Sequence, residues 1–154
     1  MKKHPRILGI DFGGKFIGLA VSDPLGVTVR GLPTLKRANK RADLDHLREL
    51  VQALGVERVV VGHPVHLRGH AGERAREAER FAAWLRRELG LPVELYDERL
   101  TSAEAENLLR ERGQRAPRTR QSRTQRVETV NRLAAAVLLQ SYLDDRRAPP
   151  TAAE

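Results

Sequence analysis

The chain of 154 residues contains no cysteine, which excludes disulfide bonds and thiolate-ligated metal sites. Aromatic residues make up only 4% of it, so base stacking is not expected to dominate any binding of nucleic acid. No apolar run approaches the ~18 residues of a membrane-spanning helix, and the run after the basic start is too short for a signal peptide. We therefore expect a cytoplasmic protein that has no membrane partner.

Acidic residues are also few, at 20 against 28 basic ones, and 23 of the basic residues are arginine. The resulting net charge of +8 favours an anionic partner, with nucleic acid as the leading candidate. The alternative is an arginine-rich surface that is simply solvated.

One stretch concentrates this charge. Between residues 112 and 126 there are six arginines and no acid, and the six include Arg118, Arg120 and Arg123. Such a segment can follow a phosphate backbone without reading its sequence. We therefore predict nucleic-acid contacts here, although a solvated run of charge remains the simpler alternative.

The length favours a single domain, which we place at residues 1–145, followed by a flexible tail at 146–154. Hydrophobic periodicity predicts, in order, three strands, a helix, a strand, a helix, a strand and two further helices. The fold class is therefore α/β, with a mixed five-stranded sheet, three antiparallel strands followed by two parallel ones, flanked by helices. The expected strands are 7–10, 16–21, 27–35, 58–62 and 91–96; the expected helices include 44–54, 78–89, one after Thr101, and 126–145, with loops at 62–72 and 113–125.

The start of the chain predicts a β-hairpin around which the sheet is organised. The apolar run at 7–10 ends at Asp11, and Gly13 and Gly14 allow a tight reversal before the second run at 16–21. A lone carboxylate at the end of a central strand is costly unless a cation meets it. The alternative is an Asp that only forms the turn.

A second acid, Glu98, follows the fifth predicted strand. In open α/β sheets ligands bind at the carboxyl ends of the strands, so Asp11 and Glu98 are expected to meet there. Two such carboxylates suit Mg²⁺ (or Mn²⁺), and the chemistry that follows is metal-assisted hydrolysis of a phosphodiester. Glu98 alternatively pairs with Arg99 or caps a helix.

A third ligand is expected from the last helix. Asn131 lies on its apolar face and Glu128 lies one turn earlier, so one of them is the candidate. An Asn offers a neutral carbonyl oxygen to a hard cation, or else hydrogen-bonds the backbone. Three histidines, His63, His66 and His70, follow the fourth predicted strand. Pro64 and Gly69 make the backbone there irregular, which favours exposed or phosphate-contacting side chains over a metal site.

Four segments resemble the four sequence blocks of the YqgF family. They are GIDFGGKFIGLAVSDPLG, VVVGHPVHLRG, YDERLTSAEAENLL and VNRLAAAVLLQSYLD, and together they cover nearly the whole chain in the family order. Members of this family are described as pre-16S rRNA nucleases, formerly as Holliday junction resolvases, and are related to RuvC. The resemblance implies an RNase H-like fold and a divalent-metal nuclease that processes the 5′ end of pre-16S rRNA during ribosome biogenesis.

The resemblance also implies roles for single residues. Asp11 and Glu98 match family acids, and Lys15 and Arg99 match basic positions that contact phosphate. The third acid is normally an Asp in the pattern D-x-x-A-A, where this chain has Asn131. The departure argues against full two-metal catalysis, unless Glu128 substitutes from one turn away.

Three other functions are weighed against this one. The first is a resolvase of branched DNA, and the second is an RNA-binding factor of weak catalytic power that assists ribosome maturation. Sugar kinases and actin-like ATPases also open with G-I-D-x-G, but they need a second domain and a longer chain. We expect a monomer or weak homodimer whose partner is a ribosomal RNA precursor.

Overall fold

The computed structural model describes residues 5–64, 70–97 and 123–147. Its five strands form one sheet in the order β3-β2-β1-β4-β5. β1 (Arg6–Phe12), β2 (Phe16–Ser22) and β3 (Val29–Lys36) are antiparallel neighbours, whereas β4 (Val56–His63) and β5 (Val93–Asp97) continue from β1 as parallel strands. The predicted mixed sheet is confirmed, and β1 lies at its centre. Pro33 lies in β3, an edge strand, where a missing N–H is tolerated.

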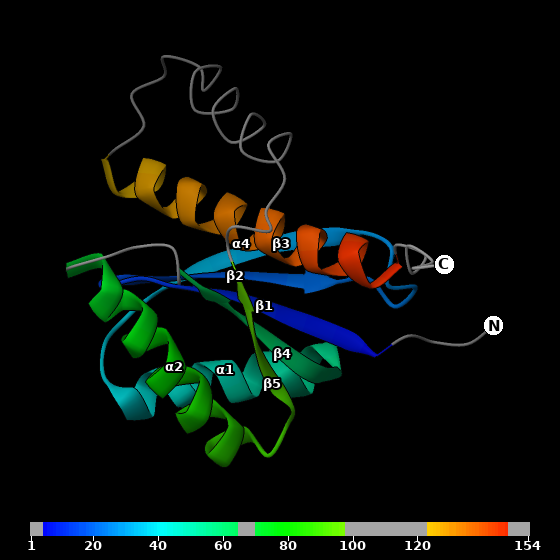
Figure 1. Ribbon diagram of the computed structural model, residues 1–154, viewed down its shortest axis with the longest axis horizontal. Coiled ribbons are helices and arrows are strands. Elements are labelled where there is room, and N and C mark those ends of the chain that lie inside the picture. The colour runs from blue at the N-terminus through cyan, green and yellow to red at the C-terminus, as the bar shows by residue number, and fades with distance from the viewer. Residues whose placement is uncertain (1–4, 65–69, 98–122, 148–154) are drawn as a thin grey trace, which may run out of the picture.

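Helices cover both faces of the sheet (Figure 1). α1 (Lys40–Leu54) and α2 (His70–Leu89) pack on one face, and α4 (Arg123–Arg147) crosses the other. α1 begins at Asn39, whose side chain accepts the N–H of Ala42, and it ends at Gly55, which has a left-handed φ of 65°. The fold class expected from the sequence is confirmed.

Alternation along β1 divides the core between the two faces. Leu8 and Ile10 belong to the cluster under α1 and α2, whereas Ile7 packs with Leu139 and Tyr142 of α4. Since successive side chains of a strand point to opposite faces, Asp11 belongs to the α4 face and Phe12 to the α1–α2 face. Phe12 accordingly stacks on Phe81 of α2 with ring centroids 4.0 Å apart.

Glycines under α4 let the helix approach the sheet closely. A methyl group added at Gly9 of β1 would lie 2.8 Å from Leu139 Cβ, and one at Gly18 of β2 would lie 2.2 Å from the carbonyl oxygen of Asn131. At Gly31 of β3 the nearest atom would be Arg132 Cγ, at 2.6 Å. Each of the three antiparallel strands therefore supplies one position without a side chain where α4 rests.

Several predicted boundaries differ from the observed ones. β1 continues through Asp11 to Phe12, because the antiparallel pairing with β2 extends to Phe12 and Ile17. The loop expected at 62–72 is shorter, since β4 runs to His63 and α2 already begins at His70. α4 is longer than predicted at both ends, so residues 123–125 and 146–147 are helical. The helix expected after Thr101 lies outside the described residues.

Candidate functional site

The C-terminal ends of β1, β4 and β5 form one edge of the sheet, which we call the carboxyl edge; it ends at Phe12, His63 and Asp97. Asp11 lies at this edge on the central strand and is half-buried. Removal from solvent raises the pKa of its carboxyl group, and the positive charge of Arg74 in α2 opposes that rise. Asp11 therefore carries its charge at a cost, which a bound cation would offset.

The backbone of Asn131 in α4 lies over the residue of β2 that pairs with Asp11. Asp11 of β1 pairs with Gly18 of β2, and the backbone carbonyl of Asn131 lies directly over Gly18. The structure thus brings the N-terminal half of α4 over the strand pair that holds Asp11. The expectation that the last helix supplies a third ligand stays a prediction.

Glu128 lies farther from Asp11. Its backbone carbonyl accepts the hydroxyl of Thr34 in β3, two strands away from β1, and its carboxylate pairs with Arg132 at 2.9 Å. Glu128 therefore already has a cationic partner on its own helix. The structure places Asn131 over β2, between Glu128 and the strand that carries Asp11.

The turn between β1 and β2 presents Lys15 at the same edge. Lys15 is exposed, and its carbonyl accepts the backbone N–H of Arg37, whose guanidinium donates to the carbonyls of Gly13 and Gly14 at 3.1 Å each. This tie between the turn and the end of β3 fixes the backbone beneath Lys15. Its exposed side chain is therefore a candidate to bind an anion at the carboxyl edge.

Most of the other expected site residues lie outside the part of the chain that the structure describes. Glu98, Arg99, Arg118 and Arg120 lie outside the described residues, and of Arg123 only its place in the first turn of α4 is known. Their proposed roles stay predictions.

Of the three histidines, His66 is also outside the described residues, and His70 is the first residue of α2. His63 bonds Glu79 of α2, with 2.9 Å between Nε2 and Oε1. Within residues 5–64, 70–97 and 123–147, no group of three or more His, Cys, Asp or Glu side chains is placed to hold a metal ion.

Sequence reasoning missed Arg74. It stands near the start of α2, far from Asp11 along the chain, and the predicted loop to residue 72 gave no reason to connect the two. α2 contains several other arginines, and no sequence signal distinguishes Arg74 from them. Only the path of α2 past the carboxyl edge brings its charge to bear on Asp11.

Comparison with known proteins places the chain in a family. A family model described as "RuvX: Holliday junction resolvase" matches residues 5–145. The chain belongs to the RuvX family. The YqgF resemblance seen in the sequence blocks is thereby confirmed.

Curated relatives agree with this assignment. A protein of Koribacter versatilis, named as a candidate pre-16S rRNA nuclease, is 47% identical over 93% of this chain and 89% of its own length. A protein of Geobacillus kaustophilus with the same name is 45% identical over 92% of this chain and 99% of its own.

Among solved structures, T. thermophilus RuvC in complex with a Holliday junction substrate aligns with a TM-score of 0.53 at 22% identity, covering 94% of this chain and 97% of RuvC. This likeness supports the RNase H-like fold of the RuvX chain. No helix among its described residues has the length and apolar character needed to cross a membrane.

Proposed function

We propose that this RuvX chain is a divalent-metal-dependent nuclease that hydrolyses phosphodiester bonds and processes the 5′ end of precursor 16S rRNA. The observation that carries the proposal is Asp11, a half-buried carboxylate at the carboxyl edge of the central strand, with α4 held over its neighbour Gly18. The names of the curated relatives support this RNA as substrate.

The donors near Asp11 fit a hard cation. A carboxylate whose pKa is raised by burial regains its ionised form when a cation approaches, and Mg²⁺ or Mn²⁺ prefers oxygen ligands. Asp11 and Glu98 would hold the metal, with Asn131 or Glu128 as the contribution of α4. The metal would supply an activated water and stabilise charge on the phosphate oxygens.

The residues of the chain have separate tasks in this scheme. Asp11 would hold the metal through its charge, and Arg74 keeps that carboxylate ionised at a lower pH than burial alone would allow. Lys15, on the turn fixed by Arg37, meets a phosphate beside the scissile one. Arg99, Arg118, Arg120 and Arg123 extend the contact along the backbone of the nucleic acid.

A second candidate is the resolution of branched DNA. It is favoured by the description of the family model, and the fold it shares with RuvC is compatible with it. A third candidate, an RNA-binding maturation factor of weak catalytic power, is favoured by the neutral Asn131 in place of an acid. The same site residues serve the first two candidates, so only the substrate separates them.

One experiment distinguishes the three candidates. Purified protein is incubated with precursor 16S rRNA and with a synthetic four-way DNA junction, each with Mg²⁺, with Mn²⁺ and with EDTA, beside the Asp11→Asn variant. We expect metal-dependent cleavage of the RNA that the variant lacks. Cleavage confined to the junction would support the resolvase, and tight RNA binding without cleavage under any metal would support the maturation factor.

A further inference from the structure

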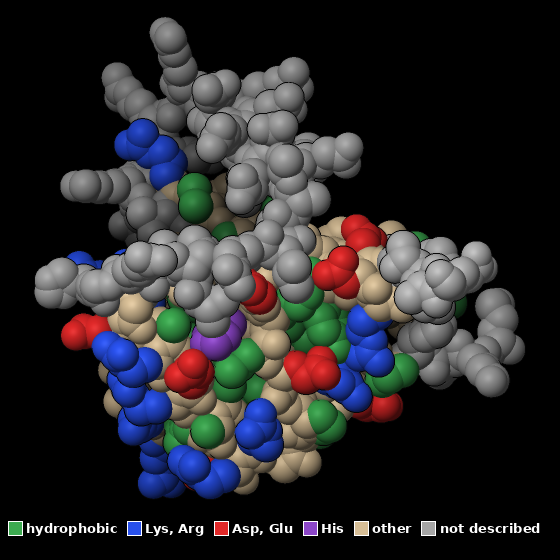
Figure 2. Space-filling view, viewed as in Figure 1, with side chains coloured by type: hydrophobic (Ala, Val, Ile, Leu, Met, Phe, Trp, Pro, Cys, Tyr) green, Lys and Arg blue, Asp and Glu red, His purple; other side chains and the backbone are tan. Residues whose placement is uncertain are grey.

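A cavity of about 310 Å³ lies on the face of the sheet opposite Asp11, and the proposed nuclease activity makes no use of it. Its lining comes from the end of β1, the connection after β3, the start of α1 and the middle of α2. Lys and Arg side chains gather over α1 and α2 at the lower left of the molecular surface (Figure 2). The cavity is lined by Phe12, Arg37, Lys40, Asp43, Glu77, Arg80, Phe81 and Trp84.

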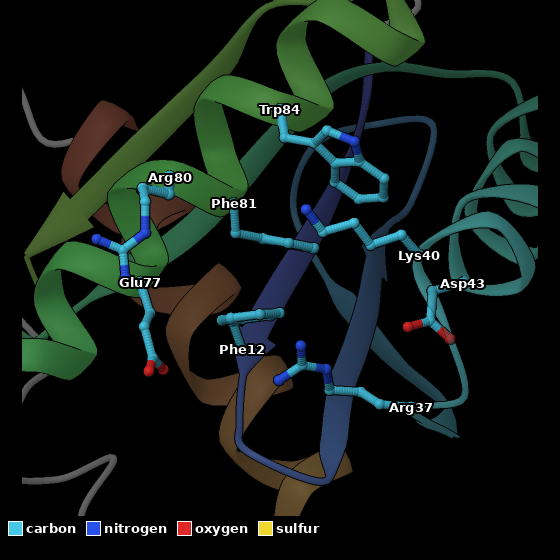
Figure 3. A pocket seen from close by; sticks show the side chains of 8 residues that line it. All are labelled: Phe12, Arg37, Lys40, Asp43, Glu77, Arg80, Phe81 and Trp84. Atoms are coloured by element: carbon cyan, nitrogen blue, oxygen red, sulfur yellow. The ribbon is translucent and has the colours of Figure 1, made fainter.

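Aromatic rings form one wall of this cavity, which we call the aromatic pocket. Phe12 and Phe81 are stacked at 4.0 Å, and Trp84 lies 5.8 Å from Phe81 between ring centroids. In Figure 3 the two phenyl rings are seen edge-on, one above the other, with Trp84 beyond them. Half of the aromatic residues of the chain, three of six, thus meet at one place.

Cations stand beside this wall. Arg37 lies 4.5 Å over the ring of Phe12, held there by its bonds to the hairpin turn, and Lys40 crosses the view between Trp84 and Phe81 (Figure 3). Lys40 has no ion-pair partner within the described part of the chain. Of the two acids in the lining, Asp43 already accepts the backbone N–H of Ala38. A planar apolar group that carries an anion matches this lining.

The pocket adjoins the candidate site. Asp11 and Phe12 are consecutive residues at the end of β1 whose side chains point to opposite faces, so a nucleic-acid strand that passes around the carboxyl edge can contact both. We propose that the aromatic pocket receives an unpaired nucleotide of the nucleic-acid substrate, its base against Trp84 and its phosphate beside Lys40. This inference rests on the proposed function, since it deepens the substrate class to one with a single-stranded segment next to the cleaved bond.

Trp84 is the only tryptophan of the chain, so its fluorescence reports on this pocket alone. Metal-free protein in EDTA is titrated with a single-stranded oligonucleotide, a blunt duplex, adenosine monophosphate and inorganic phosphate. We expect saturable quenching by the oligonucleotide at the lowest concentration, quenching by the mononucleotide at higher concentration, and none by phosphate. Quenching by the mononucleotide at concentrations below those of the oligonucleotide would overturn the proposal in favour of a free-nucleotide site.

Variants locate the contact. Lys40→Gln should weaken oligonucleotide binding about 3- to 10-fold, as expected for one lost phosphate contact. Trp84→Leu, read by anisotropy of a labelled oligonucleotide, should weaken it roughly 5- to 100-fold, whereas Trp84→Phe, which keeps a ring, should change it far less. Arg87→Gln is the matched control, since this exposed arginine of α2 lies outside the pocket lining and should leave binding unchanged.

The two hypotheses fail differently. If the wild type cleaves RNA with Mg²⁺ but the bound oligonucleotide leaves Trp84 fluorescence unchanged, the pocket is not a nucleotide site and the nuclease assignment stands. If the oligonucleotide quenches Trp84 while no substrate is cleaved with any metal, the pocket stands and the nuclease assignment falls. Equal affinity of Lys40→Gln, Trp84→Leu and wild type would overturn the pocket, provided circular dichroism shows that all three are folded.

Discussion

The backbone carbonyl of Asn131 lies so close to Gly18 that a methyl group there would come within 2.2 Å of its oxygen. Gly18 is also the residue of β2 that pairs with Asp11. The absence of a side chain at Gly18 therefore sets the distance between α4 and the candidate site. This contact is made by backbone on the helix side, so a rotamer change cannot relieve it.

Gly18→Ala should lift the N-terminal half of α4 from the sheet. We expect a loss of about 1–3 kcal/mol in unfolding free energy, the usual cost of overpacking, measured by urea denaturation. Gly14→Ala is the control, because an added methyl group there meets nothing within 4 Å and the variant should stay close to wild type. Equal stability of the two variants would mean that α4 does not rest on Gly18.

Asp11→Asn should stabilise the metal-free protein at neutral pH. Burial raises the pKa of Asp11 above its usual value of 3.8, so the neutral carboxyl is favoured in the folded state. The stability that this group contributes is full below 3.8 and is lost as the pH rises through the folded-state pKa. The neutral amide avoids that loss. Thermal melts should therefore show a higher Tm for the variant at neutral pH and a gap that narrows in acid.

Asp45→Asn is the control that tests whether the loss of any carboxylate would raise the Tm in the same way. Asp45 is exposed on α1, so its replacement should change stability by less than about 0.5 kcal/mol. A wild type that melts above Asp11→Asn at neutral pH would contradict the burial of the Asp11 charge.

Arg74→Gln should raise the pKa of Asp11 further. The positive charge of Arg74 opposes the rise in the Asp11 pKa that burial causes, and its removal leaves that rise unopposed. An NMR titration of the Asp11 carboxyl carbon in metal-free protein measures this directly, and Arg76→Gln on the same helix is the control. An unchanged Asp11 titration in Arg74→Gln would show that α2 does not act on the site.

The two candidate ligands of α4 can be separated by their placement. Asn131→Asp should raise Mg²⁺ affinity and the cleavage rate, because it adds a carboxylate over the strand next to Asp11. Glu128→Ala should lower Mg²⁺ affinity and the cleavage rate only slightly, because Glu128 pairs with Arg132 over β3. Calorimetric Mg²⁺ titrations and a cleavage assay give both values. A loss in Glu128→Ala as severe as that in Asp11→Asn would instead make Glu128 the third ligand.

The sequence predicted the sheet well for a physical reason. Short β-branched runs bounded by glycines, as in 58–62, have few alternative structures, and Pro33 marked an edge strand correctly. The predicted ends of strands were wrong where pairing with a neighbouring strand, rather than local composition, decides where a strand ends. Asp11 is a poor strand residue by propensity, yet β1 continues through it because β2 supplies partners as far as Ile17.

The candidate site was predictable only in part. A carboxylate at the end of an apolar run is visible in a sequence, so Asp11 could be proposed from it, and its catalytic role stays a prediction. The effect of Arg74 on Asp11 and the stacking of Phe12 on Phe81 beside Trp84 depend on how α2 crosses the sheet, which no local pattern encodes. Likewise, the preference for Asn131 over Glu128 follows from which strand lies beneath each turn of α4, a property of packing.

The central claim is that Asp11 is essential to a metal-dependent nuclease. The most direct test is the rate at which Asp11→Asn cleaves precursor 16S rRNA in Mg²⁺, relative to wild type. We predict that the cleavage rate of the variant falls at least about 100-fold and that its Tm is no lower than that of wild type. Loss of a residue that only supports a metal ligand already lowers activity by up to about 100-fold, so loss of a ligand itself should cost no less. Cleavage within a few fold of wild type by the folded variant would contradict the account.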